Sequence, residues 1–204
     1  MHIGNVQIKN FRLLKDSALV LEKETTLIVG RNNSGKTSLS ELMRRLLTDT
    51  STSFQLEDFS NASYDYFSNA LKAQQDGASE VEVRELLPFI ELRLEIHYDQ
   101  TQAGLGVLAP FIVDLDPTCN KTVAVIRYEL KDGGVASFFE GFPTFQESKD
   151  NAQSFFRLIK ERIPGNFAIK IWAEDPNDQT NKRVIKQTEL RHLVKTGVIN
   201  AQRG

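Results

Sequence analysis

Apolar and polar positions alternate over the first 30 residues in a way that predicts short strands. Residues 3–9 place Ile3, Val6 and Ile8 between polar neighbours, as a strand with one buried face requires. A shorter apolar run at residues 18–21 predicts a second strand, and the run Thr-Thr-Leu-Ile-Val at residues 25–29 predicts a third. The charged residues 22–24 between them read as the connecting turn.

The pattern changes to a helical period at residues 36–47, where leucine and methionine recur at three- and four-residue spacing. Similar spacing predicts helices over residues 62–75 and 145–163, and Pro164-Gly165 ends the second of them. Shorter helical segments are expected at residues 105–115 and 189–195. Residues 48–61 are rich in Ser, Thr, Asp and Asn, which is typical of a loop.

Strict alternation returns at residues 90–98, with one apolar and one charged face, and this favours an antiparallel sheet. Residues 122–130, 135–139, 167–172 and 183–185 are further predicted strands, the first two joined by a Lys-Asp-Gly-Gly turn. His97 falls on the polar face of its strand, where a solvated side chain is expected rather than a metal ligand. The 13 phenylalanines are expected in the core rather than as a stacking platform for bases.

Composition places the chain among ordinary globular proteins of one large or two small domains. It has 204 residues, of which 40% are hydrophobic and 25% charged. A net charge of -2 argues against a globally basic nucleic-acid binder. Cys119 is the single cysteine, no apolar run approaches the roughly 18 residues of a membrane span, and the N-terminus lacks a signal-peptide pattern. A cytoplasmic location is therefore expected.

Residues 30–37, Gly-Arg-Asn-Asn-Ser-Gly-Lys-Thr, match the phosphate-binding pattern G-x-x-x-x-G-K-[ST] between a predicted strand and a predicted helix. Gly30 permits a sharp turn, and Gly35 lets the backbone approach phosphates without a Cβ atom in the way. Amides of residues 32–37 and the start of the helix would then face an anion. Lys36 is placed to reach the β- and γ-phosphates and Thr37 to bind Mg²⁺. The alternative is a Gly/Asn-rich turn with an incidental lysine.

The residues around this loop narrow the type of protein. Ile-Lys-Asn-Phe-Arg at residues 8–12, a charged hairpin and the loop itself resemble the head domain of SMC-like, ABC-type ATPases. Within that group, residues 28–39 look most like the OLD (overcoming lysogenisation defect) family of ATP-dependent endonucleases, and residues 199–204 are similar to a segment which that family carries after its first lobe.

The resemblance implies an α/β fold: the first lobe of an ABC/SMC-like P-loop ATPase head, a mixed sheet with an antiparallel β subdomain and flanking helices. Residues 1–48 would form the first strands, the loop and its helix, and residues 49–204 the rest of the lobe. The second lobe and the nuclease module would lie outside residues 1–204, so we expect the chain to be an N-terminal portion of a longer protein.

The resemblance also implies roles for single residues, with ATP and Mg²⁺ as ligands. Asn32 would set the γ-phosphate end, Arg12 would lie near the nucleotide and Gln202 would act as a magnesium-sensing glutamine. Arg12 has an equally weighted alternative as a solvated turn residue. The residues expected to bind nucleotide are Arg12, Gly30, Arg31, Asn32, Asn33, Ser34, Gly35, Lys36, Thr37 and Ser38, with Thr37 and Gln202 toward the metal.

Catalysis by such a head needs a Walker B strand, four apolar residues followed by Asp-Glu, and the sequence offers none. Residues 111–114 and 171–175 come nearest, but the first has Leu115 in place of the glutamate and the second has its acids reversed. No catalytic residue is therefore expected in this chain. Signature and nuclease residues are expected outside it.

We expect an ATP-binding segment of an OLD-like endonuclease, used in DNA processing or anti-phage defence and nearly inactive in isolation. Its partners would be a second head in a head-to-head dimer and DNA bound through regions outside this chain, with no membrane contact. The alternatives are a head of an SMC-like DNA-repair ATPase without a nuclease, and a nucleotide-dependent interaction module.

Overall fold

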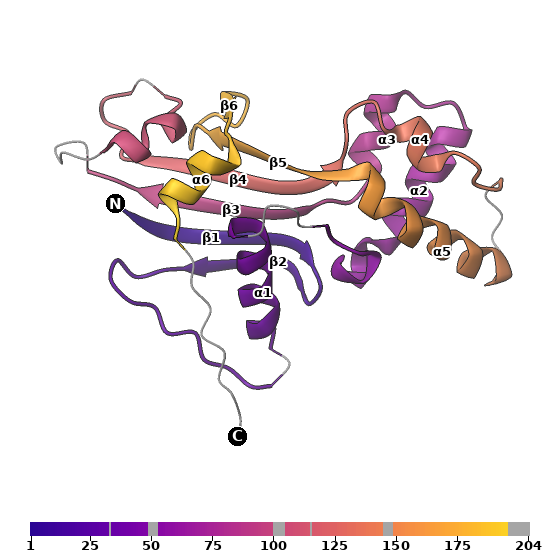
Figure 1. Ribbon diagram of the computed structural model, residues 1–204, viewed down its shortest axis with the longest axis horizontal. Coiled ribbons are helices and arrows are strands. Elements are labelled where there is room, and N and C mark those ends of the chain that lie inside the picture. The colour runs from indigo at the N-terminus through magenta and orange to yellow at the C-terminus, as the bar shows by residue number, and fades with distance from the viewer. Residues whose placement is uncertain (33, 49–52, 100–104, 115, 145–148, 196–204) are drawn as a thin grey trace.

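A six-stranded sheet runs through the protein in the strand order β2-β1-β3-β4-β5-β6, and every pairing is antiparallel (Figure 1). The computed structural model describes residues 1–32, 34–48, 53–99, 105–114, 116–144 and 149–195. The strands are β1 (His2–Phe11), β2 (Leu14–Val20), β3 (Ile90–His97), β4 (Lys121–Leu130), β5 (Phe167–Glu174) and β6 (Lys182–Val184).

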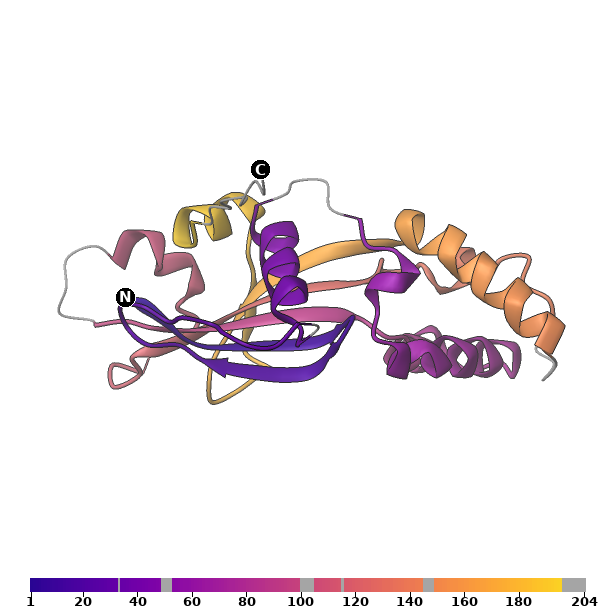
Figure 2. The same ribbon diagram turned by 90° about the horizontal axis from the view of Figure 1, so that it is seen from below.

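Helices cover one face of the sheet and one end of its strands. The helices are α1 (Lys36–Leu47), α2 (Tyr64–Gln75), α3 (Glu80–Leu86), α4 (Val135–Phe139), α5 (Lys149–Asn166) and α6 (Gln187–Leu193). Figure 2 shows α1 and α6 on the same side of the sheet, with the β5–β6 turn projecting from the opposite side. Helices α2 to α5 gather beyond one end of the strands (Figure 1). In the described part of the chain, no helix combines the length and apolarity that crossing a bilayer requires.

The predicted α/β class, the antiparallel subdomain and the flanking helices are confirmed. Helix α1 has the predicted bounds, and the helices expected at residues 62–75, 145–163 and 189–195 correspond to α2, α5 and α6. The stop predicted at Pro164-Gly165 is wrong, because α5 continues through both residues to Asn166. The short helix expected at residues 105–115 consists of two 3-10 turns, Leu105–Val107 and Ala109–Phe111. Helix α3 was not predicted, although Ser79 and Glu82 form a capping box at its start.

The strand predicted at residues 135–139 is wrong, because this segment is the helix α4. A turn lies where the hairpin turn was predicted, with the Gly134 amide donating to the carbonyl of Lys131 at 3.1 Å, but it leads into a helix and not into a second strand. After the turn, Val135, Phe138 and Phe139 are all buried, at a spacing of three and four residues that only a helix brings to one face.

The strand predicted at residues 25–29 is also wrong, because these residues pair with no described strand. Leu27 and Val29 are 82% and 77% exposed, while Ile28 between them is 41% exposed and lines a groove with Leu39 and Met43 of α1. The side chains therefore alternate as in a strand, but the backbone lacks the neighbour that would complete a ladder.

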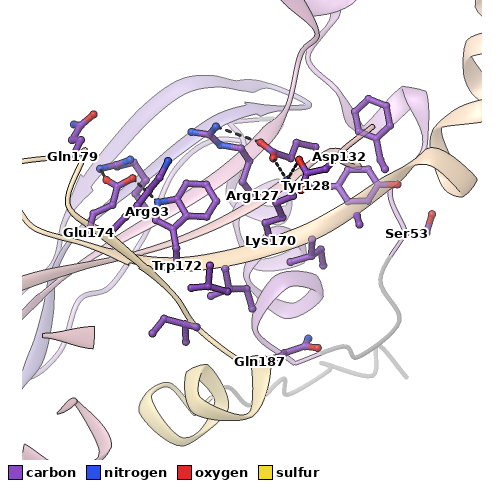
Figure 3. A pocket seen from close by; sticks show the side chains of 18 of the residues that line it. Ser53, Arg93, Arg127, Tyr128, Asp132, Lys170, Trp172, Glu174, Gln179 and Gln187 are labelled. Carbon is purple, nitrogen blue, oxygen red and sulfur yellow. Dashed lines mark hydrogen bonds and ion pairs between the residues drawn. The ribbon is translucent and has the colours of Figure 1, made fainter. Parts of the chain in front are cut away.

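The face of the sheet opposite α1 carries charged side chains that are paired with one another (Figure 3). Glu91 is 1% exposed and accepts a 2.7 Å hydrogen bond from Nε of Arg127, whose guanidinium lies 4.9 Å from the ring centroid of Trp172. Glu174 accepts from Trp172 Nε1 at 2.6 Å and from Arg93. An open cavity of about 1070 Å³ follows β5 beside these residues. Both basic and acidic side chains line it, so the lining does not favour a ligand of either charge.

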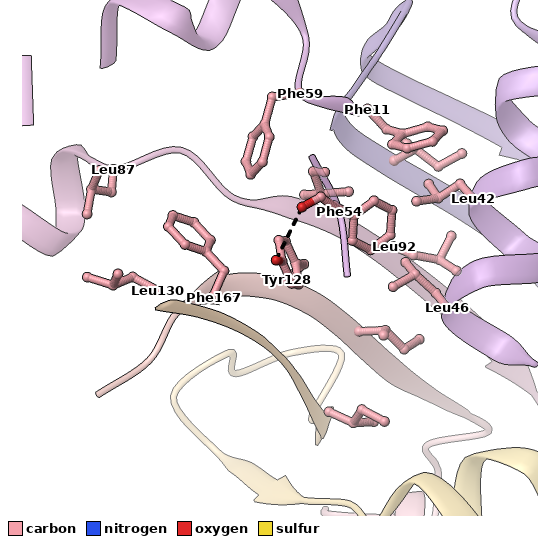
Figure 4. Close-up of a cluster of buried hydrophobic side chains, with 14 of the residues drawn as sticks. Phe11, Leu42, Leu46, Phe54, Phe59, Leu87, Leu92, Tyr128, Leu130 and Phe167 are labelled. Atoms are coloured by element: carbon pink, nitrogen blue, oxygen red, sulfur yellow. Dashed lines mark hydrogen bonds between the residues drawn. The ribbon is translucent and has the colours of Figure 1, made fainter. Parts of the chain in front are cut away.

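The core lies between the sheet and α1 and continues into an aromatic cluster toward α2–α5 (Figure 4). Leu42 and Leu46 of α1 face Leu92 of β3, and all three are fully buried. Phe54 and Tyr128 continue this layer with ring centroids 5.0 Å apart. Of the 12 phenylalanines in the described part of the chain, nine are buried, which agrees with the prediction that they serve the core.

Candidate functional site

The predicted phosphate-binding loop leads directly into α1, as its sequence spacing requires. Gly35 occupies the N-cap position of this helix with φ 88°, a left-handed conformation that favours glycine. The amide of Leu39 donates to the carbonyl of Gly35 at 2.8 Å and closes the first helical turn. The amides of residues 36–38 have no partner inside a helix that begins there, so they remain available to an anion.

Lys36 points back into the loop. Its Nζ donates to the carbonyl oxygens of Gly30 at 2.5 Å and Arg31 at 2.7 Å, and to Oγ of Ser34 at 3.2 Å. Its ammonium group is therefore surrounded by backbone and hydroxyl oxygens of the loop that the sequence pattern identified. A triphosphate would offer charged oxygens to the same ammonium group in place of these neutral ones. Hydrogen bonds to charged oxygens are stronger than those to neutral oxygens.

Both pattern glycines are constrained by close neighbours. A Cβ atom on Gly30 would lie 2.8 Å from Oγ of Ser34, and one on Gly35 would lie 2.9 Å from Cδ2 of Leu14. The first clash involves a short side chain inside the loop, whereas the second adds to a backbone angle that other residues avoid. Gly35 is therefore the more demanding of the two positions.

The remaining loop residues divide by exposure. Arg31, Asn32, Ser34 and Thr37 are exposed, and Ser38 is buried beneath the helix start at 8% exposure. Thr37 thus offers its hydroxyl to solvent at the first turn of α1, as a magnesium ligand there would require. The predicted residues Asn33 and Gln202 lie outside the described residues.

Arg12, at the tight turn between β1 and β2, is held by a carboxylate. Its Nε and Nη2 donate to Oδ1 of Asp58 at 3.0 and 2.7 Å, and its side chain remains 38% exposed. The other carboxylate oxygen, Oδ2, accepts from Nη1 of Arg45 in α1 at 2.8 Å and from the amide of Gln55 at 3.0 Å. Asp58 therefore links the turn that bears Arg12 to the helix that follows the phosphate loop.

Burial of Asp58 acts to raise its pKa, but the Gln55 amide and the guanidinium groups of Arg45 and Arg12 outweigh it. The net effect lowers the pKa of Asp58 below its ordinary value, so the carboxylate is charged at neutral pH. On α1 itself, the hydrogen bond from Arg44 lowers the pKa of Glu41, and the nearby charge of Arg12 contributes to this shift.

The backbone around Arg12 is strained. Asn10 and Arg12 have φ of 58° and 49°, and they are the only non-glycine residues with positive φ among the described residues. Such a conformation costs about 1–2 kcal/mol for an ordinary residue. Hydrogen bonds offset the cost: the amide of Ser60 donates to the Asn10 carbonyl at 3.0 Å, and the Arg12 amide to the Asp58 carbonyl at 2.9 Å.

Asp58 is the residue of this site that sequence reasoning missed. It stands in a polar stretch that was predicted only as a loop, and its partners Arg12 and Arg45 lie 46 and 13 residues away. No periodicity or motif connects residues at such separations. The available signal was local: Gln55 and Asp58 form a capping box around a 3-10 turn.

The two segments nearest in sequence to a Walker B strand serve other purposes. Asp114 accepts a 3.0 Å hydrogen bond from the Asp116 amide within a turn. Glu174 is 4% exposed and is engaged by Arg93 and Trp172. Both agree with their interpretation as ordinary element ends, and the described residues contain no group of three or more His, Cys, Asp or Glu side chains arranged to hold a metal ion.

Comparison with known proteins places the chain in a family. A family model described as the AAA ATPase domain matches residues 1–196. Endonuclease GajA from Bacillus cereus (strain HuB5-5) is 26% identical over 196 residues, which cover 92% of this chain and 28% of GajA. The chain thus spans little more than a quarter of that relative's length.

Among solved structures, one from work on ATP-driven dimerization and DNA-stimulated activation of SMC ATPases matches with a TM-score of 0.44 and 13% identity. The match covers 94% of this chain and 76% of that one.

Proposed function

The chain belongs to the AAA ATPase domain family, and from this premise we propose that residues 30–38 bind the triphosphate of ATP together with Mg²⁺. The observation that supports the proposal best is the position of Lys36, whose ammonium lies among the loop oxygens of Gly30, Arg31 and Ser34. In the same loop, the left-handed Gly35 occupies the N-cap of α1, and the first amides of a helix favour an anion.

Each residue of the loop has a separate task in this proposal. Lys36 exchanges its carbonyl partners for β- and γ-phosphate oxygens, and the exposed Thr37 hydroxyl becomes a ligand of Mg²⁺. Ser38 supports the cradle from its buried position, and Asn32 sets the γ-phosphate end. Gln202 and Asn33 complete the set of residues proposed to bind the nucleotide and its metal. Gln202 would act at the Mg²⁺ ion, and Asn33 would belong to the phosphate-binding loop.

Arg12 is proposed as a further phosphate contact. Its side chain is partly exposed beside α1, and the planar guanidinium fork that it carries recognises phosphate oxygens in two places at once. The strained backbone at Asn10 and Arg12 is the kind of feature that is retained where geometry matters for function. The alternative is a solvated turn arginine, whose positive φ belongs to the two-residue turn between β1 and β2.

We propose that the ATPase domain is completed by protein outside residues 1–204. The exposed apolar segment at residues 27–29 has the side-chain alternation of a strand but no described neighbour. A second lobe that supplies such a neighbour would bury Leu27 and Val29 and would bring the Walker B and signature residues. The isolated chain would then bind ATP weakly and hydrolyse it negligibly.

The proposed role of the whole protein is that of an OLD-like ATP-dependent endonuclease in DNA processing or anti-phage defence. The similarity to endonuclease GajA supports this reading, and the motifs around the loop agree with it. ATP held between two such heads would couple nucleotide state to dimer geometry and so to a nuclease. DNA would be bound through regions outside this chain.

Nucleotide titration tests the loop. Calorimetry with Mg²⁺–ATP should show a loss of about tenfold or more in affinity for Lys36→Ala relative to the natural chain, since a charged phosphate contact is removed. Lys72→Ala is the matched control, because Lys72 is an exposed lysine of α2. Equal affinity of the Lys36→Ala variant would refute the assignment, and robust ATP turnover by this chain alone would refute the need for further catalytic parts.

A further inference from the structure

The guanidinium of Arg12 is held along one edge and open along the other. Nε and Nη2 both donate to Oδ1 of Asp58, while no described residue accepts a hydrogen bond from Nη1. The Arg12 side chain as a whole is 38% exposed, so a ligand can approach it from solvent. The arrangement leaves a cation fixed in direction with part of its hydrogen-bonding capacity unused.

Asp58 can hold Arg12 firmly because it is itself immobile. Its side chain is 7% exposed, and its second oxygen accepts from Arg45 and from the amide of Gln55. Arg45 is fixed in turn by a 2.6 Å hydrogen bond to the Ser53 carbonyl and by the ring of Phe54, 4.1 Å away. The rotational freedom of Arg12 is therefore lost on folding rather than on binding a ligand.

The same contacts place Arg12 in a fixed relation to the phosphate loop. Arg45 belongs to the last turn of α1, whose first residue is Lys36. At the other end of α1, Leu14 from the turn of Arg12 lies against Gly35. The β1–β2 turn therefore touches the start of the helix directly and its last turn through Asp58.

We propose that Asp58 is a positioning residue, which holds the guanidinium of Arg12 so that its open edge meets a phosphate oxygen of a nucleotide bound at residues 30–38. The inference rests on the proposed function, because it requires a polyphosphate in the loop. It goes further than that function because Asp58, a residue outside the phosphate-binding motif, would orient Arg12 before the phosphate binds. The competing account is that Asp58 only anchors residues 53–60 to α1.

Binding of Mg²⁺–ATP to single and double variants separates these accounts. Asp58→Asn keeps the shape of the side chain and removes its charge, so it should weaken Mg²⁺–ATP binding three- to tenfold, as should Arg12→Ala. The double variant should be no weaker than Arg12→Ala alone, because Asp58 acts through Arg12. An unchanged affinity in Asp58→Asn, or an additive loss in the double variant, would overturn the inference.

Arg45→Met is the control for a purely structural effect. It removes one of the two groups that hold the second oxygen of Asp58 and leaves the Gln55 amide and both Arg12 contacts in place. It should therefore lower thermal stability without changing Mg²⁺–ATP affinity by more than about twofold. A loss of affinity in Arg45→Met equal to that in Asp58→Asn would show that stability alone explains both, and would also overturn the inference.

Nuclear magnetic resonance of the Arg12 Nε–H group provides a readout that does not depend on affinity. In the natural chain this proton should exchange slowly with water, and Asp58→Asn should make its exchange at least tenfold faster. Addition of Mg²⁺–ATP should shift the Arg12 signal and the amide signals of residues 30–37. A shift of the loop amides without Arg12 would refute the positioning role alone, whereas a shift of neither would refute the proposed function as well.

Discussion

The guanidinium of Arg191 donates a 2.6 Å hydrogen bond to the carbonyl oxygen of Thr48, the residue that follows α1. Carbonyl groups at this end of a helix lack helical partners and carry the negative end of its dipole. Helix α6 therefore stabilises the C-terminal end of the same helix whose N-terminal end forms the phosphate loop. The C-terminal end of α1 is thus held by a residue that lies 143 positions away in sequence.

Removal of the Arg191 guanidinium should destabilise the fold. For Arg191→Met we expect the free energy of unfolding to fall by about 1.5–3 kcal/mol, the usual contribution of a hydrogen bond from a charged donor. Urea denaturation followed by circular dichroism measures this difference. Arg183→Met, in the exposed strand β6, is the control and should change stability by less than about 0.5 kcal/mol. Similar losses in both variants would show that the Thr48 contact is unimportant.

The exposed segment at residues 27–29 should tolerate polar substitution in this chain. Leu27 is 82% exposed whereas Leu42 on α1 is fully buried. Leu27→Ser should leave the free energy of unfolding within about 0.5 kcal/mol of the natural value, and Leu42→Ala should lower it by about 2–5 kcal/mol. Thermal denaturation of the two variants provides the comparison. A large loss in Leu27→Ser would mean that the segment is already packed as a strand in this chain.

The phosphate loop could be predicted from the sequence because its chemistry is local. The glycines, Lys36 and Thr37 lie within eight consecutive residues. The spacing of the leucines after them predicts the helix that follows. The antiparallel strands were also predictable, since alternation at residues 90–98 records one buried and one solvated face.

The wrong predictions of secondary structure fall on segments whose conformation is determined by tertiary contacts. Residues 135–139 have apolar composition that suits a strand, but the aromatic cluster of Phe138, Phe167 and Phe67 selects the helical spacing. Residues 25–29 have the composition of a strand, but strand formation depends on a neighbour that no local pattern reveals. The partners of Asp58 were unpredictable for the same reason, because they are distant in sequence.

The buried carboxylate of Glu91 should be essential to the sheet face opposite α1. It is engaged by Arg127, and Arg93 lies 4.0 Å away. Glu91→Ala should lower the free energy of unfolding by about 3–5 kcal/mol, because it leaves Arg127 without its buried counter-charge, whereas Arg93 keeps Glu174. Glu85→Ala, on the exposed side of α3, serves as the control in the same urea titration. If both variants lose equally little, the ion pairs on this face contribute no net stability.

Stability should depend on pH through Asp58 in a defined direction. Its folded-state pKa lies below the ordinary value of 3.8, so between the two pKa values the unfolded chain binds a proton that the folded chain does not. The free energy of unfolding therefore rises with pH across that window. The stabilisation that Asp58 contributes is fully present above about pH 5 and is lost as pH falls through the folded-state pKa. The slope from this one group cannot exceed about 1.4 kcal/mol per pH unit.

Comparison of the natural chain with Asp58→Asn isolates this contribution from that of other carboxylates. At pH 7 the variant should be less stable by about 1.5–3 kcal/mol, since charge-assisted hydrogen bonds from two arginines are weakened. The difference should stay constant down to about pH 5 and then shrink below pH 3.8, because protonation of Asp58 removes the same charge in the natural chain. Urea denaturation at a series of pH values measures it, and a difference that stays constant to pH 2 would contradict the assignment of Asp58 as the charged centre of the cluster.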